Sequence, residues 1–205
     1  MSYRYEFALR ERIGANCAAF ERRVIEDSER RAATAIALVD DAGEAGYLFI
    51  RRALTMRRNP GQYALPGGRA EPGESAEHTA RRELAEELGV DLGPETVLGV
   101  LDDLPTRAGG VVTPVVLWAG GAVTMALDPD EVHDAWVRPV AELDHPEAPR
   151  RVTLDGVEGQ VLRMPVGGEW INPPTAAMLY QFREVGLHGR TVRVHDVASP
   201  LWTAK

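Results

Sequence analysis

The chain contains very little cysteine and almost no lysine, and each shortage excludes a kind of chemistry. Cys17 is the only cysteine among 205 residues, so neither an intrachain disulfide nor a cysteine zinc cluster can form. Of the 23 basic residues, all but Lys205 are arginine, and the end of a chain is a poor place for a Schiff-base lysine. Scarce thiols are typical of a reducing compartment, so we expect a cytoplasmic protein.

Acidic residues outnumber basic ones, 31 to 23, and long apolar runs are nearly absent. The net charge of −8 argues against nucleic-acid binding driven by overall charge. The first twelve residues lack the apolar core of a signal peptide. Residues 108–127 are uncharged and long enough for a membrane span, but Pro114 and the Gly120-Gly121 pair interrupt them. We therefore expect two buried strands there and no membrane partner.

The remaining composition suits one folded domain with a terminal element, because 44% of the residues are hydrophobic. Apolar residues at Ile13, Cys17, Phe20 and Val24 predict a helix with one buried stripe over residues 6–28. We interpret residues 1–30 as an N-terminal helical extension and residues 31–205 as the main domain. The helix could cover the sheet or pair with a second subunit, which leaves a homodimer open.

The main domain is predicted to alternate strands with helices. One helix follows Ser75, which can cap its start, and ends at Leu88 before Gly89. A second helix begins after Pro173-Pro174 and runs to about residue 185, with Gly186 as its stop. A single helical turn is expected at 139–143, a hairpin at 150–166, and strands at 32–39, 47–50, 61–65, 97–104, 111–118 and 134–137. This order predicts an α/β sandwich with a mixed sheet.

A positive block and a negative block follow one another in the middle of the chain. Residues 45–70 contain no acid but hold five arginines, Arg51, Arg52, Arg57, Arg58 and Arg69. Residues 71–91 hold seven acids, Glu71, Glu74, Glu77, Glu83, Glu86, Glu87 and Asp91. This pattern fits a phosphate-binding segment beside a cation-binding one, but charge alone favours two solvated faces that pair with each other.

The spacing of three acids on the predicted helix favours the first interpretation. Glu83, Glu86 and Glu87 are spaced i, i+3, i+4 and fall within about a third of the helix circumference. Their carboxylates repel one another, and the apolar residues beside them indicate that this helix is partly buried. A divalent cation would relieve the repulsion, and oxygen ligands favour Mg²⁺ or Mn²⁺ over zinc. Arg82 could orient one carboxylate.

Residues 68–90, GRAEPGESAEHTARRELAEELGV, resemble the signature of the Nudix hydrolase family. The signature positions are occupied by Gly68, Glu74, Arg82, Glu83, Leu84, Glu86, Glu87, Gly89 and Val90. The resemblance implies an α/β/α sandwich and hydrolysis of a nucleoside diphosphate linked to another group. It also implies that Glu83, Glu86 and Glu87 bind Mg²⁺ or Mn²⁺ with the Gly68 carbonyl, that Arg82 holds the glutamates, and that Glu74 supports the unit.

This chemistry needs a base that takes a proton from the attacking water. Metal ions neutralise the charged diphosphate oxygens and lower the pKa of a bound water, which then attacks phosphorus in line. Glu83 is our first choice as the base. Relatives place the base variously on this helix or on a later loop, and Glu131 in the acidic turn at 128–131 is the candidate on such a loop.

An upstream segment resembles coenzyme A pyrophosphatases within the same family. Residues 48–68 match their spacing at Leu48, Arg52, Ala53, Arg57, Gly61, Pro66, Gly67 and Gly68, and depart at Phe49, Ile50 and Leu65. We expect Arg52, Arg57 and Arg69 to bind substrate, because coenzyme A carries a 3′-phosphate besides its diphosphate. The alternatives are an ADP-ribose or nucleoside-triphosphate pyrophosphohydrolase, or a ligand-sensing module without catalysis.

Overall fold

A mixed β-sheet forms the centre of the fold in the computed structural model, which describes residues 2–57, 59–106, 109–153 and 160–194. Its central path runs β3-β2-β1-β7-β5, while β4 pairs with β1, β6 with β7 and β8 with β2. β1 and β7 are parallel and the other pairs are antiparallel. The strands are β1 (Arg31–Asp41), β2 (Glu44–Arg52), β3 (Tyr63–Ala64), β4 (Gly67–Arg69), β5 (Val97–Val100), β6 (Leu104–Pro105), β7 (Val111–Trp118) and β8 (Val132–Pro139).

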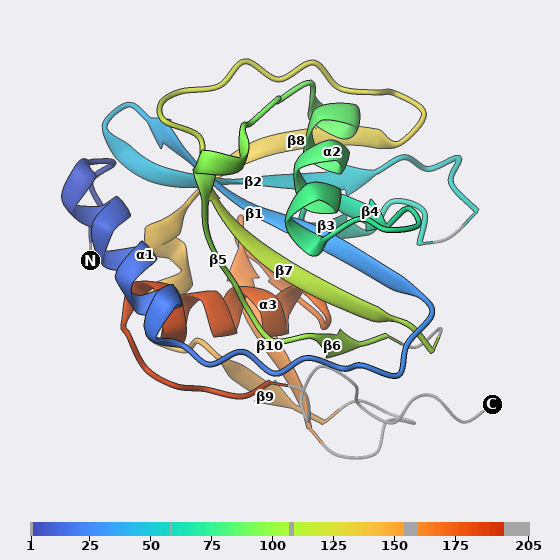
Figure 1. The fold of residues 1–205 in the computed structure, drawn as a ribbon. Coiled ribbons are helices and arrows are strands. Elements are labelled where there is room, and N and C mark those ends of the chain that lie inside the picture. Colours follow the sequence, from blue (N-terminus) through green and yellow to red (C-terminus); the bar gives the residue numbers. More distant parts are fainter. Residues whose placement is uncertain (1, 58, 107–108, 154–159, 195–205) are drawn as a thin grey trace.

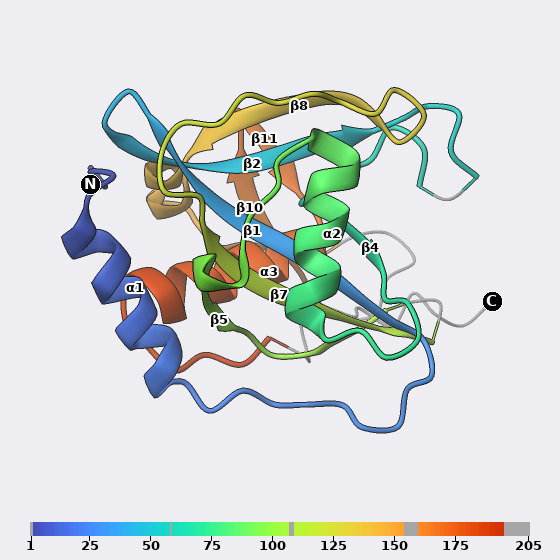
Figure 2. The same ribbon diagram turned by 45° about the horizontal axis from the view of Figure 1, so that its top comes forward.

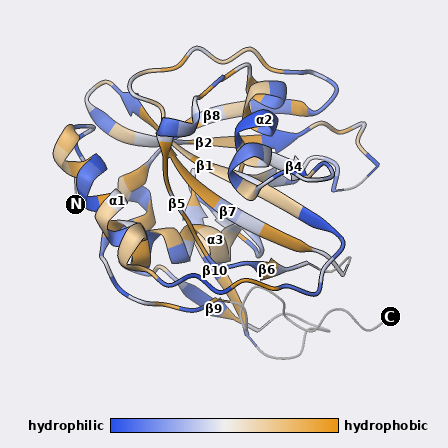
Figure 3. Cartoon of the chain, viewed as in Figure 1, coloured by the Kyte–Doolittle hydropathy of each residue, from blue (hydrophilic) through white to orange (hydrophobic). Residues whose placement is uncertain are grey.

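Helices cover both faces of this sheet, so the predicted α/β/α sandwich is confirmed. Helix α2 (Ala76–Leu88) packs on one face, and α1 (Phe7–Ala19) and α3 (Thr175–Phe182) pack on the other (Figures 1 and 2). Side chains of a strand alternate between its faces, and β1 follows this rule. Ala35 and Ala37 pack toward α2, whereas Ile36 and Leu38 face the other core. Figure 3 shows the resulting apolar stretches along the central strands.

A small second sheet adjoins α3. It consists of β9 (Arg150–Val152), β10 (Val161–Val166) and β11 (Glu169–Ile171), and the β9–β10 pairing confirms the predicted hairpin, whose connection at 154–159 lies outside the described residues. The predicted turn at 139–143 appears as the 3-10 segment η2 (Val140–Asp144), and another such segment, η1 (Pro94–Thr96), precedes β5. Gly186 does not stop the last helix, because it lies within the π-helical segment η3 (Arg183–Leu187) that continues α3.

The N-terminal helix is shorter than predicted, because two buried aspartates hold the chain that follows it. Asp102 accepts a hydrogen bond from the Arg23 N–H at 2.7 Å, and Asp103 accepts one from the Ile25 N–H at 3.0 Å. These N–H groups therefore bind carboxylates instead of helix carbonyls. The helix ends at Ala19, and Val24, predicted to be buried, is 44% exposed.

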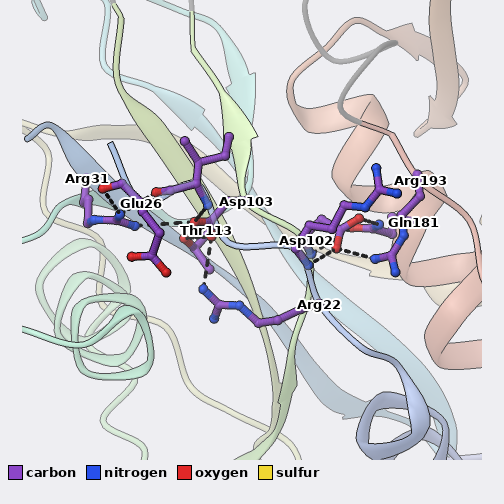
Figure 4. A network of polar contacts seen from close by, with 10 residues as sticks. Arg22, Glu26, Arg31, Asp102, Asp103, Thr113, Gln181 and Arg193 are labelled. Atoms are coloured by element: carbon purple, nitrogen blue, oxygen red, sulfur yellow. Dashed lines mark hydrogen bonds and ion pairs between the residues drawn. The ribbon is translucent and has the colours of Figure 1, made fainter. Parts of the chain in front are cut away.

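The same two aspartates divide the predicted strand at 97–104 into β5 and β6. Asp103 contacts Arg22, Arg31 and Thr113, while Asp102 contacts Gln181 and Arg193 (Figure 4). This network ties the segment after α1 to β7, to α3 and to the chain beyond it. Since α1 packs its buried stripe into the core on that face, the helix covers the sheet. The division at residue 30 stays a prediction.

The uncharged run at 108–127 supplies one strand rather than two. β7 occupies Val111–Trp118, and residues 119–127 form a loop, so the second predicted strand is wrong. The loop N–H of Ala126 donates to the Leu88 carbonyl at 2.8 Å, and therefore satisfies the end of α2 instead of a sheet edge. Among the described residues, no helix combines the length and apolarity that a membrane crossing requires.

Candidate metal centre

Three carboxylates converge between α2 and the sheet. Oxygens of Glu83, Glu87 and Glu131 lie within 4.8 Å of one another. Glu83 and Glu87 come from one face of α2, and Glu131 comes from the turn that precedes β8. The helix is held at both ends as predicted, because the Ser75 hydroxyl accepts from the His78 N–H and Gly89 adopts the left-handed conformation at φ 67°.

Glu87 is the most enclosed of the three acids, with 1% of its surface exposed. Its Oε2 accepts a hydrogen bond from the Gly67 N–H at 2.9 Å, whereas its buried Oε1 has no hydrogen-bond partner among the described residues. The nearest positive group is Arg52, whose Nη1 lies 3.7 Å from Oε1. Burial raises the pKa of Glu87 to about 8, and the charges of Glu83 and Glu131 contribute to the rise.

Glu83 lies directly against the glycine loop. A Cβ atom on Gly68 would overlap the Glu83 carboxylate, so only glycine permits this approach. Burial raises the pKa of Glu83, while Arg82, whose Nη1 lies 2.9 Å from Oε1, opposes the rise. The structure therefore brings two of the predicted metal ligands together beside Gly68.

Glu86, the third predicted ligand, is not brought into this cluster. Its side chain is 57% exposed and pairs with Arg82 at 2.7 Å. The position along the helix explains the difference: Glu87 is about 40° from Glu83 in projection, whereas Glu86 is about 60° away in the opposite sense. The assignment of Glu86 to the metal stays a prediction.

Glu131 is the third acid of the cluster, because backbone hydrogen bonds fix its position from two sides. Its carbonyl accepts from the Ala53 N–H at 2.8 Å, which joins it to the end of β2. The Asp128 N–H donates to the Glu87 carbonyl at 3.1 Å, which joins the turn to α2. The sequence predicts Glu131 only as an alternative base, because no spacing rule links it to the helix.

Arg82 connects the cluster to the loop before the helix. Its Nε and Nη2 lie 2.9 and 3.1 Å from the two oxygens of Glu74, and Nη2 also donates to the Arg69 carbonyl at 2.9 Å. Glu74 further accepts from the Thr79 hydroxyl and the Glu71 N–H. These bonds, with Arg82 first among them, lower the pKa of Glu74 to about 2.

The predicted substrate-binding arginines are placed differently from one another. Arg52 reaches the acidic cluster, while the side chains of Arg57 and Arg69 are exposed. Arg58, a member of the same positive block, lies outside the described residues. The structure therefore places Arg52 at the cluster and leaves the other two arginines exposed to solvent, and substrate binding by all three stays a prediction.

The residues present fit a hard divalent cation. All three acids offer oxygen, the ligand that Mg²⁺ and Mn²⁺ prefer. The unpartnered buried oxygen of Glu87 is a second, independent indication, since buried carboxylate oxygens are nearly always satisfied. A cation at this point would satisfy that oxygen and offset the mutual repulsion of the carboxylates.

Glu74→Gln is expected to lower the free energy of unfolding by about 1 to 3 kcal/mol at pH 7, because hydrogen bonds to a charged group are lost. The low folded-state pKa means that this contribution is present above about pH 4.5 and is lost as the pH falls toward 2. The difference between variant and wild type should therefore shrink between pH 7 and pH 3 in urea unfolding. Glu71→Gln, exposed in the same loop, is the control, and an equal difference at both pH values would contradict the prediction.

Comparison with known families identifies the class of protein to which this arrangement belongs. The NUDIX domain family matches residues 29–155, which include all eight strands of the central sheet and the three residues of the acidic cluster. The chain therefore belongs to the Nudix domain family.

The chain is also similar to two curated proteins and to one solved structure. Nudix hydrolase 3 of Caenorhabditis elegans is 32% identical over 127 residues, which cover 59% of this chain and 53% of that protein. The uncharacterized Nudix hydrolase NudL of Photorhabdus laumondii is 33% identical over 119 residues, covering 58% and 63%. The MutT protein of Methanosarcina mazei Go1 is 24% identical, with a TM-score of 0.46 and coverage of 58% and 83%. The matches span about half to two thirds of the curated relatives' length.

Proposed function

We propose that this chain is a metal-dependent hydrolase that cleaves the diphosphate bond of a nucleoside diphosphate derivative, with Mg²⁺ or Mn²⁺ as the cofactor. The observation that carries the proposal is the convergence of Glu83, Glu87 and Glu131, together with a buried Glu87 oxygen that has no hydrogen-bond partner among the described residues. A divalent cation bound there would supply charge neutralisation and a water of lowered pKa. Membership of the Nudix family supports the same reaction class.

The protein's own residues then bind, orient and accept a proton. Arg82 holds Glu83 from one side while Glu74 fixes Arg82 from the other. Glu83 remains our first choice for the group that takes the proton from the attacking water, and Glu131 is the alternative because it lies in the same cluster. Arg52, Arg57 and Arg69 are proposed to bind phosphates of the substrate.

Coenzyme A or an acyl-coenzyme A is the substrate we favour, with 3′,5′-ADP and 4′-phosphopantetheine as products. Support comes from the upstream arginine pattern. Arg52 lies at the acidic cluster, and Arg57, which follows it closely in the sequence, has an exposed side chain that could bind an additional phosphate. An ADP-ribose or nucleoside-triphosphate pyrophosphohydrolase is the alternative. A sensing module without catalysis is less favoured, because every glutamate of the signature is present.

A substrate panel tests this proposal. The pure protein is incubated with coenzyme A, ADP-ribose, a dinucleotide and dGTP in Mg²⁺ or Mn²⁺, and products are identified by mass spectrometry in ¹⁸O water. We expect cleavage of coenzyme A between its two phosphorus atoms, and loss of turnover when EDTA removes the metal. Much faster cleavage of ADP-ribose would select the alternative, and no cleavage of any compound would favour the sensing module.

A further inference from the structure

We propose that Arg52 is a positioning residue that exchanges partners. Without a bound metal ion its guanidinium lies against Glu87, and with a metal ion in place it turns to a phosphate of the substrate. The inference rests on the proposed function, since it assumes a cation and a diphosphate at the same site. It goes further by assigning Arg52 two successive contacts instead of one.

The contact between Arg52 and Glu87 is close but incomplete. Nη1 of Arg52 lies 3.7 Å from Glu87 Oε1, which is near enough for attraction and too long for a hydrogen bond. Oε1 accordingly has no hydrogen-bond partner in the described part of the chain, although it is buried. Arg52 is thus a loosely held counter-ion that leaves the oxygen available to a cation.

The backbone around Arg52 is fixed, so an exchange can involve the side chain alone. Its N–H donates to the Gln62 carbonyl at 3.0 Å, and its own carbonyl accepts from the Gly61 N–H at 3.2 Å. The next residue, Ala53, donates to Glu131. The side chain is 20% exposed and therefore reaches the solvent from which a substrate arrives.

Charge makes the two partners of Arg52 mutually exclusive. A divalent cation on Glu87 Oε1 would lie within a few ångströms of the guanidinium in its present position, and two positive charges repel strongly in a half-buried site. A diphosphate brings negative charge to the same place, and guanidinium groups bind phosphate in bidentate geometry. Arg52 should therefore oppose binding of the cation alone and favour binding of the diphosphate.

A purely structural role for Arg52 would have the opposite effect on the affinity for the cation. If Arg52 only held Glu87 in position for the metal, its removal would weaken cation binding. If Arg52 exchanges partners, its removal tightens cation binding and weakens diphosphate binding. The changes in affinity for the cation and for the diphosphate can both be measured without substrate turnover.

The test compares Arg52→Gln with wild type and with Arg51→Gln. Arg51 is the preceding residue of β2, and it contacts the Gly61 carbonyl and Asp134 instead of the cluster, so its substitution removes the same charge elsewhere. Binding of Mn²⁺ alone is measured by electron paramagnetic resonance of the free ion at pH 8.5. Binding of methylenediphosphonate, a diphosphate that cannot be hydrolysed, is then measured by calorimetry in saturating Mn²⁺.

We expect Arg52→Gln to bind Mn²⁺ about threefold to tenfold more tightly and methylenediphosphonate at least about tenfold more weakly. Arg51→Gln should change both affinities by less than about twofold. Arg52→Lys keeps the charge without the bidentate fork, so its Mn²⁺ affinity should match wild type while its methylenediphosphonate affinity falls. The lysine variant carries the test if the glutamine variant does not fold.

The possible outcomes separate this inference from the proposed function. Weaker or unchanged Mn²⁺ binding in Arg52→Gln overturns the exchange while leaving the metal site intact. Unchanged methylenediphosphonate binding overturns it as well, because Arg52 would then have only one partner. Failure of the wild-type protein to bind Mn²⁺ overturns the proposed metal site, and the inference with it.

Discussion

Glu83→Gln is expected to lower the rate of diphosphate hydrolysis by about two to four orders of magnitude, the range typical of a lost general base. The substitution keeps the shape of the side chain but removes its charge and its ability to accept a proton. Because Glu83 shares the cluster with Glu87 and Glu131, the change would also replace a charged oxygen of the proposed metal site by a neutral amide oxygen. KM for the substrate should change less than kcat.

The same variant should be at least as stable as wild type when no metal is present. Burial raises the pKa of Glu83, so folding disfavours its ionised form, and a neutral glutamine avoids that cost above the raised pKa. Loss of the 2.9 Å contact with Arg82 offsets part of the gain. The melting temperature in EDTA should therefore stay equal or rise, while the increase that Mn²⁺ gives to wild type should be lost.

Glu77→Gln is the matched control, because it makes the same chemical change in the first turn of the same helix. It should leave kcat and the Mn²⁺-dependent rise in melting temperature near the wild-type values. Normal turnover by Glu83→Gln would remove Glu83 from its assigned role. A large loss of stability in EDTA would instead show that Glu83 supports the fold.

The helix that carries the acids could be predicted from sequence because its signals are local. Ser75 and Gly89 cap its two ends, and Leu84 and Leu88 are fully buried as their spacing predicts. These features depend on residues within one or two turns of each other. Strands β1, β2, β7 and β8 were predicted from similarly local patterns, with boundaries shifted by at most a few residues.

The membership of the acidic cluster depends on tertiary structure and could be predicted only in part. Spacing alone grouped Glu86 with its neighbours, but it could not show which side of α2 faces the sheet. Glu131 lies 44 residues beyond Glu87 in the numbering and reaches it because Ala53 and Asp128 fix the intervening turn. A polar turn in a sequence does not reveal such contacts.

The early end of α1 has a related cause. The apolar spacing up to Val24 continues the helical period, yet Arg23 and Ile25 donate their N–H groups to Asp102 and Asp103. Carboxylates almost 80 residues away thus compete successfully with local helix formation. Nothing in the local sequence indicates this competition.

Gly67→Ala is expected to be the most damaging small substitution in the glycine loop. Gly67 has a φ of 153°, and an added Cβ would overlap the Ala33 carbonyl and press on the Thr34 Cα, both backbone atoms of β1. Backbone atoms in a paired strand cannot move aside cheaply, so β4 must shift away from β1. We expect a loss of about 3 to 5 kcal/mol in the free energy of unfolding, measured in urea. The Gly67 N–H would also lose its bond to Glu87, and Mn²⁺ binding should weaken.

Gly68→Ala should affect metal binding more than stability, because the atoms nearest to its added Cβ belong to the Glu83 carboxylate instead of the backbone. That carboxylate is the end of a flexible side chain, so we expect weaker Mn²⁺ binding with a loss of stability below about 1 kcal/mol. Gly73→Ala controls for backbone strain alone, since its φ is 86° and nothing lies within 4 Å of the added atom. It should cost about 1 kcal/mol and leave Mn²⁺ binding unchanged. Equal stability losses at Gly67 and Gly73 would show that the approach of β4 to β1 adds nothing beyond the dihedral cost.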